Sequence, residues 1–128
     1  MKILLSGSSG LIGSALAAAL ASEGHSVVRL VRSQSSRSLR FVATAQEQEQ
    51  AVQWNPSTGI LAAMELEGME AVVHLAGENI ASGRWTRARK ERIRRSRIDG
   101  TDLLTRTLAQ LARPPRVLVC ASAIGYYG

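Results

Sequence analysis

The feature that most constrains this chain is a glycine-rich turn near its N-terminus. Three glycines at the spacing GxxGxxG follow the short apolar run at residues 2–5, and an alanine-rich segment with helical spacing begins at once. A strand, a tight turn and a helix N-terminus make a pyrophosphate site, because unpaired N–H groups and the positive end of the helix dipole face the anion. The sequence therefore predicts a dinucleotide bound by the residues of this turn: Gly7, Ser9, Gly10, Leu11, Ile12 and Gly13.

Each glycine has a separate expected role in such a turn. Gly7 allows the turn itself, Gly10 lets backbone N–H groups approach the anion, and Gly13 lets the helix pack closely on the strand. The alternative is a plain strand-to-helix turn in another kind of α/β domain. A P-loop for phosphoryl transfer is disfavoured, because no Gly-Lys-Ser/Thr follows the turn.

The length and composition fit one α/β domain. The 128 residues are 45% hydrophobic but only 4% aromatic, which is enough to bury a core rich in Ala, Leu and Val. No apolar run approaches the ~18 residues that span a membrane, and the N-terminus does not resemble a signal peptide. The single Cys120 cannot form an internal disulfide, in agreement with a reducing compartment. We therefore expect a soluble, cytoplasmic protein without membrane contact and without a metal site.

The net charge of +6 comes from one segment. Residues 84–97 hold eight basic residues and one acidic residue, so they carry +7 and the rest of the chain carries −1. A solvated helix face, contacts to an anionic ligand and a nucleic-acid patch all fit this run. Trp85 is its only aromatic residue, and no helix-turn-helix or RNA-binding motif accompanies it. Nucleic acid is therefore the least favoured partner.

The apolar runs predict a parallel sheet with helices on both faces. Buried strands are expected at residues 2–5, 26–32, 51–54, 70–77 and 116–121. Helices are expected at 11–21 and 61–67 and from 85 to about 112, the last bent near Asp99 and Gly100. Residues 33–50 are polar and fit a loop or a partly ordered helix. This order predicts a Rossmann-type, doubly wound α/β fold with strand order 3-2-1-4-5.

The end of the second expected strand bears on which dinucleotide binds. In NAD sites an acidic residue lies there, about 20 residues past the glycines, and binds the ribose 2′-OH. This chain has Arg32 instead, with Ser33 beside it and Arg29 three residues before. A guanidinium and a hydroxyl suit a 2′-phosphate, which a carboxylate would repel. We expect NADP to be preferred over NAD; the alternative is that Arg32 is simply a polar residue at a strand end.

Longer motifs resemble a known family, the extended short-chain dehydrogenases/reductases. After the glycine turn the chain carries, in order, His74-Leu-Ala-Gly77, Ile98-Asp-Gly-Thr-Asp-Leu-Leu104 and Ala121-Ser-Ala-Ile-Gly-Tyr-Tyr-Gly128. Trp54-Asn-Pro, Arg84-Trp-Thr and Ser96-Arg97 narrow the resemblance to NAD(P)-dependent sugar-nucleotide epimerases/dehydratases, the epimerase family proteins. The likeness covers the whole chain except residues 43–50, which look like an insertion.

The resemblance implies roles for residues outside the glycine turn. Leu75, Ala76 and Gly77 would pass under the adenine-ribose part of the cofactor. Arg97 stands where many relatives carry a helix Asn, and it either holds a phosphate or anionic substrate or forms a surface salt bridge. Ser122 lies near the serine of the family's Ser-Tyr-Lys catalytic set, although the usual register falls on Ala123. Glu78 and Asn79 either line the pocket or cap its turn.

The resemblance also implies that part of the active site is absent. The family's Tyr-x-x-x-Lys lies beyond Gly128, and neither Tyr126 nor Tyr127 is followed by the required Lys. Residues 1–128 thus look like an N-terminal NAD(P)-binding Rossmann domain without the C-terminal substrate-binding part. The implied function is an NADP-binding oxidoreductase or epimerase that transfers hydride on a nucleotide-sugar-like or other small hydroxyl or keto substrate. A non-catalytic NADP-binding regulator or sensor is the alternative, and the sequence leaves enzymatic competence and oligomerisation open.

Overall fold

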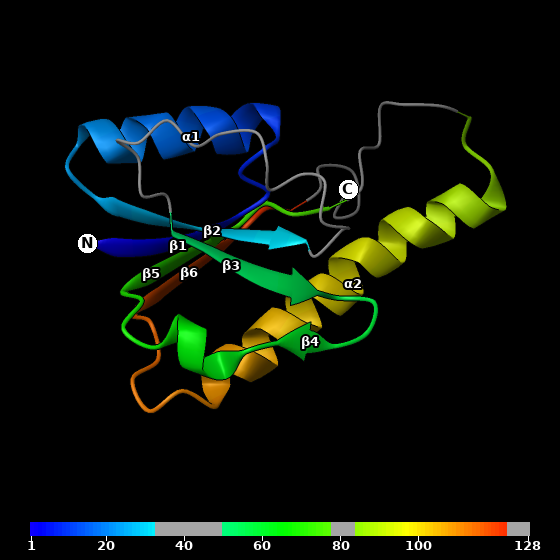
Figure 1. The fold of residues 1–128 in the computed structure, drawn as a ribbon. Helices are drawn as coiled ribbons and strands as arrows, with labels where there is room; N and C mark the ends of the chain where they lie inside the picture. Colours follow the sequence, from blue (N-terminus) through cyan, green and yellow to red (C-terminus); the bar gives the residue numbers. More distant parts are fainter. Residues whose placement is uncertain (33–49, 78–83, 123–128) are drawn as a thin grey trace.

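The computed structural model describes residues 1–32, 50–77 and 84–122, which form a largely parallel sheet between two α-helices (Figure 1). Hydrogen-bonded neighbours follow the order β4-β3-β2-β1-β5-β6. Among the described strands only β4 is antiparallel, beside β3, so the parallel strands confirm the predicted order 3-2-1-4-5. The strands are β1 (Lys2–Ser6), β2 (Ser26–Arg32), β3 (Gln50–Asn55), β4 (Ile60–Leu61), β5 (Ala71–His74) and β6 (Val117–Cys120).

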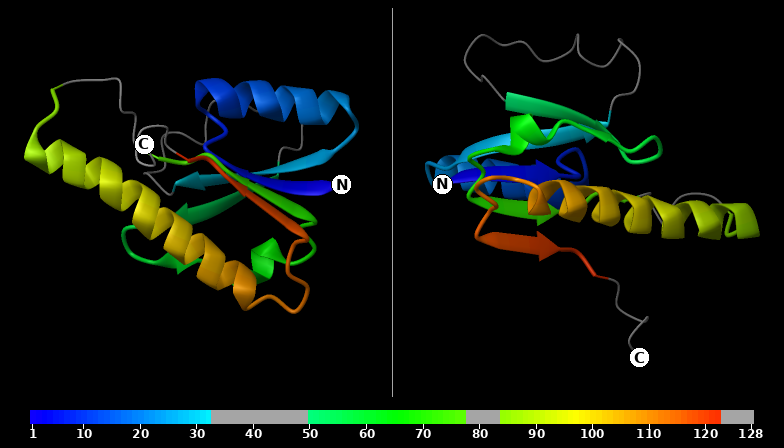
Figure 2. Two further views of the ribbon diagram at one scale, coloured as in Figure 1. Left: turned by 180° about the vertical axis from the view of Figure 1, so that it is seen from behind. Right: turned by 90° about the horizontal axis from the view of Figure 1, so that it is seen from below.

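The two α-helices lie on opposite faces of the sheet (Figure 2). Helix α1 (Leu11–Ser22) packs on β1 and β2, and helix α2 (Arg87–Ala109) crosses the other face. The main core lies under α2, where helix leucines pack on apolar residues of four strands. The helix supplies Leu104 and Leu108, and the strands supply Leu4, Val28, Leu30, Val52, Trp54 and Val72. In the described ranges neither helix is both long enough and apolar enough to cross a membrane.

The register of the sheet decides which polar side chains face α2. Side chains alternate between the two faces of a strand, so Ser6 shares the α2 face with buried Leu4. Ser6 pairs with Leu30 on one side and with His74 on the other. Two residues further along β2, Arg32 pairs with Trp54 and faces the same layer. The sheet therefore aims three polar side chains at α2 near its carboxyl edge.

The two halves of α2 differ in what they contact. The C-terminal half buries Leu104, Thr107 and Leu108 against the sheet, whereas the arginine-rich N-terminal half runs out beyond the strand ends (Figure 1). The predicted long helix is confirmed, since one helix runs from residue 87 to 109 through Asp99 and Gly100, and the bend expected there stays a prediction. A Cβ at Gly100 would lie 3.3 Å from the Trp54 ring, so this glycine makes room for the tryptophan.

The helix predicted at 61–67 is wrong. Leu61 belongs to β4 and pairs with Trp54, and only Ala63–Leu66 are helical, as a short 3-10 turn, η2. Gly59 has a φ of +76° and turns the chain back toward β3. Leu66 is fully buried, so tertiary packing outweighs the helix propensity of this short segment.

The last strand is placed correctly but is not buried as expected. In β6 the exposed fractions of Val117, Leu118 and Val119 are 49%, 39% and 50%, because the strand forms the edge of the described sheet. The predicted loop or helix at 33–50 lies outside the described residues, apart from Gln50, which begins β3.

Candidate dinucleotide-binding site

The glycine turn joins β1 to α1 and leaves backbone donors at the sheet edge. Gly7 has a φ of +72°, a conformation that favours glycine, and the Gly10 N–H donates to the Gly7 carbonyl at 3.2 Å. Gly10 is the N-cap of α1 in an extended conformation, with no side-chain cap. Because the first N–H groups of a helix lack intrahelical acceptors, this end of α1 is suited to an anion.

The three glycines differ in why they must lack a side chain. A Cβ at Gly7 would lie 2.7 Å from the carbonyl carbon of Leu75, and one at Gly13 would collide with the Gly7 carbonyl. A Cβ at Gly10 would meet only the Gly7 oxygen, at 3.4 Å. The fold thus requires Gly7 and Gly13, whereas the open side of Gly10 fits close approach by a ligand.

The first turn of α1 leaves apolar surface beside these donors. Leu11 is 89% exposed and Ile12 is 70% exposed, and Ser9 is also exposed. Exposed apolar side chains next to unpaired backbone N–H groups fit a ligand with both anionic and planar apolar parts, such as a dinucleotide. The residues present are therefore compatible with the group that the sequence predicts.

A buried hydrogen-bond chain holds the loop at residues 75–77 against the glycine turn. Ser6 Oγ accepts from the N–H groups of Leu75 and Ala76, at 3.1 and 3.2 Å, and lies 2.6 Å from His74 Nδ1. With two N–H donors on the oxygen, the hydroxyl proton points to Nδ1, so the imidazole carries its own proton on Nε2. That atom lies 3.1 Å from Thr101 Oγ1 on α2. The chain links β1, β5 and α2.

The environment keeps this imidazole neutral. His74 is only 4% exposed, and its ring meets the edge of Trp54 with centroids 6.0 Å apart. Burial lowers the pKa of His74 below 6.5, because desolvation disfavours the charged form. A neutral ring can accept from Ser6 and donate to Thr101 at once.

Arg97 lies over the same loop. A Cβ at Gly77 would be 3.0 Å from the guanidinium carbon of Arg97, so the planar group covers the glycine backbone. Arg97 as a whole is an exposed residue. The structure thus brings the glycine turn, residues 75–77 and Arg97 together, as expected for one ligand-binding region.

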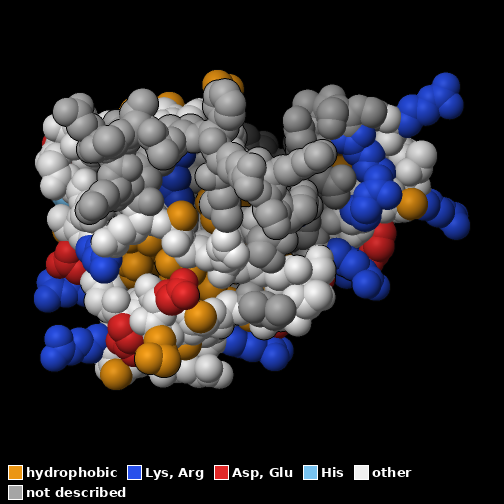
Figure 3. Space-filling view, in the orientation of Figure 1, with side chains coloured by type: hydrophobic (Ala, Val, Ile, Leu, Met, Phe, Trp, Pro, Cys, Tyr) orange, Lys and Arg blue, Asp and Glu red, His pale blue; other side chains and the backbone are white. Residues whose placement is uncertain are grey.

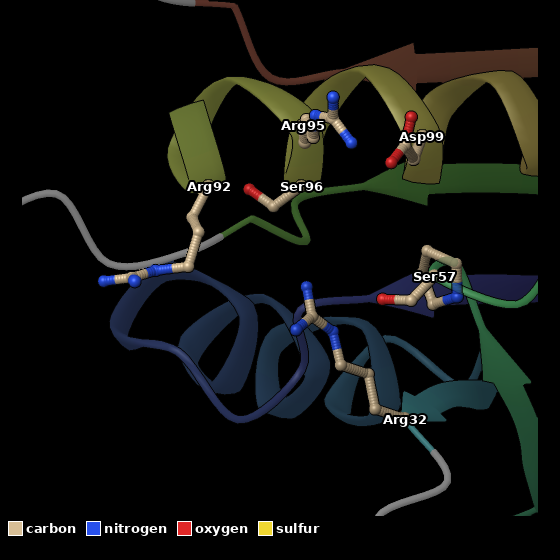
Figure 4. A pocket seen from close by; sticks show the side chains of 7 residues that line it. Arg32, Ser57, Arg92, Arg95, Ser96 and Asp99 are labelled. Atoms are coloured by element: carbon tan, nitrogen blue, oxygen red, sulfur yellow. The ribbon is translucent and has the colours of Figure 1, made fainter. Parts of the chain in front are cut away.

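Arg32 has different neighbours. It lines a pocket of about 340 Å³ with the turn that follows β3 and one face of α2 (Figure 4). The helix contributes residues at positions i, i+3, i+4 and i+7, which lie on one face. The lining residues are Arg32, Pro56, Ser57, Arg92, Arg95, Ser96 and Asp99.

The basic segment is therefore not one uniform surface, although basic side chains gather over this half of α2 (Figure 3). Arg92 and Arg95 line the pocket, Arg97 covers Gly77, and Arg89 is 8% exposed. Glu91 accepts from Arg95 at 3.0 Å and lies 3.9 Å from Arg94. The same helix thus carries arginines that pair with Glu91 and arginines that line the pocket or cover Gly77.

Ser122 lies at the same sheet edge as the loop at residues 75–77. The preceding residue, Ala121, donates its N–H to the His74 carbonyl at 3.0 Å, and Ser122 itself is exposed. Its catalytic role stays a prediction. Other expected residues lie outside the described part of the chain: Ser33, Glu78, Asn79, Ala123, Tyr126 and Tyr127.

Sequence reasoning missed two sets of residues. The Ser6, His74 and Thr101 chain depends on strand register, and its only signal was a lone histidine in an apolar run. The pocket residues of α2 were hidden in a charge run, although their spacing marks one helical face. Across the described ranges, no three His, Cys, Asp or Glu side chains gather closely enough to hold a metal ion.

A glycine turn between β1 and α1, the strand order and the helices on both faces define a Rossmann-type α/β fold. The family model of the NAD dependent epimerase/dehydratase family matches residues 3–128. The chain belongs to this family.

Individual relatives agree with that assignment. An epimerase family protein of Mycobacterium bovis is 42% identical over 126 residues, which cover 98% of this chain and 38% of the relative. The crystal structure of the human epimerase family protein SDR39U1 (isoform 2) with NADPH is 26% identical, with a TM-score of 0.74, and is matched over 100% of this chain and 38% of its own.

A short-chain dehydrogenase/reductase superfamily protein from Agrobacterium tumefaciens, solved with bound NAD, is 27% identical with a TM-score of 0.65. The match covers 96% of this chain and 33% of that protein. The chain thus spans between 33% and 38% of the length of these relatives.

Proposed function

We propose that residues 1–128 form an NAD(P)-binding Rossmann domain that binds NADP in preference to NAD. The pyrophosphate would lie at the N-terminus of α1, held by the turn from Gly7 to Gly13. Leu75, Ala76, Gly77 and Arg97 would form the wall beyond it. The 2′-phosphate would lie at Arg32. The observation that carries the NADP preference is this guanidinium at the end of β2, in a pocket at the sheet edge.

The comparisons support a nicotinamide dinucleotide, since one relative was crystallised with NADPH and another with NAD. An arginine in place of the acidic strand-end residue of NAD sites favours the phosphorylated form. When bound, the nicotinamide ring supplies hydride-accepting and hydride-donating chemistry. The proposed activity of the whole protein is that of an oxidoreductase or epimerase on a nucleotide-sugar-like or other small hydroxyl or keto substrate.

Arg32→Asp tests the cofactor preference. Fluorescence titration with NADPH and NADH should give NADPH binding about 10- to 100-fold weaker in the variant, because a charge-assisted contact is replaced by repulsion. NADH binding should be equal or tighter. Arg116→Asp makes the same charge change at the opposite edge of the sheet, before β6, and should leave both affinities unchanged. Equal or tighter binding of NADH by the unchanged protein would contradict the proposed preference.

The catalytic part of the proposal needs a separate test. Turnover is followed by the absorbance of the reduced nicotinamide with nucleotide sugars and small hydroxyl or keto compounds. If Ser122 bonds a substrate oxygen, Ser122→Ala should lower kcat by about 10²-fold and leave the NADP Kd unchanged. Binding of NADP without turnover of any substrate would favour a regulator or sensor instead.

A further inference from the structure

The hydrogen-bond chain from Ser6 to Thr101 contains a buried imidazole to which the proposed function gives no role. His74 ends β5, and its Nδ1 lies 2.6 Å from Ser6 Oγ of β1. Its Nε2 lies 3.1 Å from Thr101 Oγ1 of α2. The loop at residues 75–77 follows it directly in the chain, and the proposed function places that loop in the wall of the cofactor site. A titratable ring therefore lies at the base of this wall.

We propose that His74 is a positioning residue for dinucleotide binding, and that only its neutral ring lets Ser6 hold the loop at residues 75–77 in place. The imidazolium form weakens this hold, so the affinities for NAD and NADP fall together as the ring takes up a proton. This inference rests on the proposed function and names a regulation of the same site.

The Ser6 oxygen has no capacity for a third donor. A hydroxyl offers one proton and two lone pairs, and the N–H groups of Leu75 and Ala76 donate to it at 3.1 and 3.2 Å. The contact with His74 Nδ1 must then use the hydroxyl proton, so Nδ1 is the acceptor. The neutral ring, with its proton on Nε2 toward Thr101, satisfies all of these groups at once.

Protonation of the ring creates competition at this oxygen. An imidazolium carries a proton on both nitrogens, so Nδ1 would donate to Ser6 and compete with the N–H groups of Leu75 and Ala76. At least one of the two loop hydrogen bonds must then weaken. The Thr101 contact is kept, because Nε2 carries a proton in both forms of the ring. The loop, and not α2, therefore bears the effect of the added charge.

The loop is in close contact with the glycine turn. A Cβ at Gly7 would lie 2.7 Å from the Leu75 carbonyl carbon and 2.9 Å from the Ala76 nitrogen. The Gly7 carbonyl in turn accepts from the N–H of Gly10, the N-cap of α1. A shift of the loop would therefore disturb both the wall and the anion-binding turn of the proposed site. Since both serve every dinucleotide, NAD and NADP should be affected alike.

Burial decides the charge of the ring. Ser6, Trp54 and Thr101 contact it from β1, β3 and α2, and all three side chains are uncharged. Burial lowers the pKa of His74 below 6.5, so the ring is neutral in neutral solution and gains its second proton only on acidification. The loop is therefore fully held in neutral solution and is released as the pH falls.

The titratable and charged side chains on the elements packed against the ring have other surroundings. Cys120 on β6 is the register partner of His74 and is exposed. On α2, Asp99 lines the pocket of Figure 4, and Asp102 accepts from the arginine four residues further on, at 3.0 Å. Arg97 lies over the loop, against the backbone of its last residue. The uncharged contacts of the ring and its burial thus set its protonation.

The test follows the Kd of NAD against pH in the unchanged protein, in His74→Asn and in His25→Asn. NAD is the probe because the 2′-phosphate of NADP itself titrates at about pH 6. His74→Asn keeps an acceptor near the position of Nδ1 and cannot be protonated. From about pH 8 to about pH 5.5, the Kd should rise about fivefold in the unchanged protein and in His25→Asn, the effect of about one hydrogen bond. In His74→Asn it should change by less than about 1.5-fold.

A second measurement reads the loop without any ligand. On acidification, nuclear magnetic resonance should show the amide proton of Leu75 or Ala76 moving upfield and exchanging faster with water, because its hydrogen bond weakens. This change should follow the titration of the His74 ring and should be absent in His74→Asn. Circular dichroism at each pH restricts the comparison to folded protein.

The outcomes separate this inference from the proposed function. If the Kd of NAD stays constant in the unchanged protein, or rises by the same factor in His74→Asn, the role of His74 is overturned and dinucleotide binding stands. If both loop amides stay unchanged while the ring titrates, the coupling through Ser6 is overturned. If the unchanged protein binds neither NAD nor NADP, the proposed function fails, and the amide signals still decide whether protonation of the ring releases the loop.

Discussion

The glycine turn and the pocket at Arg32 are both suited to phosphate, but the turn offers backbone N–H groups and the pocket offers arginine side chains. The turn uses backbone N–H groups at a helix N-terminus, and its geometry is fixed by close packing of Gly7 and Gly13. The pocket uses long side chains from β2 and α2. Backbone donors recognise the part common to every dinucleotide, whereas side chains can be exchanged to select one of them.

The difference predicts two classes of variant. Changes in the turn should act on folding or on all dinucleotides alike, because the backbone there serves the whole ligand class. Changes in the pocket should act on the phosphorylated cofactor only, as proposed for Arg32. Changes in the glycine turn and in the residues that hold it test this distinction.

Gly13→Ala should be the most damaging change. Its Cβ would collide with the Gly7 carbonyl, and backbone on both sides leaves little freedom to relax. We expect a loss of about 3 kcal/mol in the free energy of unfolding and loss of binding to NAD and NADP together. Urea unfolding with parallel cofactor titration measures both. Wild-type stability in this variant would contradict the close packing described for the turn.

Ser6→Ala should come next. It removes the donor to His74 and an acceptor of the part-buried N–H groups of Leu75 and Ala76, at a cost of about 2 kcal/mol in the free energy of unfolding. Ser22→Ala is the matched control, since its exposed hydroxyl bonds only the Ala19 carbonyl, and it should cost less than about 0.5 kcal/mol. Equal effects of the two changes would show that the buried chain adds nothing.

Gly10→Ala should separate binding from folding. Its Cβ meets no protein atom closer than 3.4 Å, so the stability should change by less than about 1 kcal/mol. Affinity for NAD and NADP should fall equally, by about tenfold or more, because the added methyl group faces the approaching pyrophosphate. A selective loss of NADP alone would break the distinction between turn and pocket.

The smallest expected effect is the response to pH. The pKa of His74 is lowered in the folded protein relative to its ordinary value of 6.5, so the unfolded chain takes up the proton first. The free energy of unfolding should therefore be constant above neutrality and should fall as the pH drops below 6.5 toward the folded pKa. His74→Asn should lessen this decline, and His25→Asn, at a half-buried position beside the N-terminal amine, should retain it.

Most of the sheet was predictable because each parallel strand is a short local run of apolar residues. The glycine turn was predictable for the same reason, since spacing and context both lie within thirteen residues. Ser6 and His74 were not, because their contact depends on how β1 and β5 align. The same holds for Arg32 and Arg92, which share a pocket only through the facing of β2 and the phase of α2.

The errors have a common physical origin. Residues 61–67 contain good helix formers, but pairing of Leu61 with Trp54 and burial of Leu66 favour a strand and a short 3-10 turn. Gly100 in α2 likewise depends on a distant residue, because its missing side chain leaves space for the Trp54 ring. In each case a contact distant in sequence outweighs the local preference.

The edge contact between Trp54 and His74 gives this protein an internal optical reporter. Its two tryptophans differ sharply, since Trp54 is 1% exposed and Trp85 is 57% exposed. A quencher dissolved in water should reach Trp85 first, and Trp85→Phe would leave emission from Trp54 alone. An imidazolium quenches indole emission more strongly than a neutral imidazole does. The intensity of Trp54 fluorescence in Trp85→Phe should therefore report the charge on His74 without any added dye.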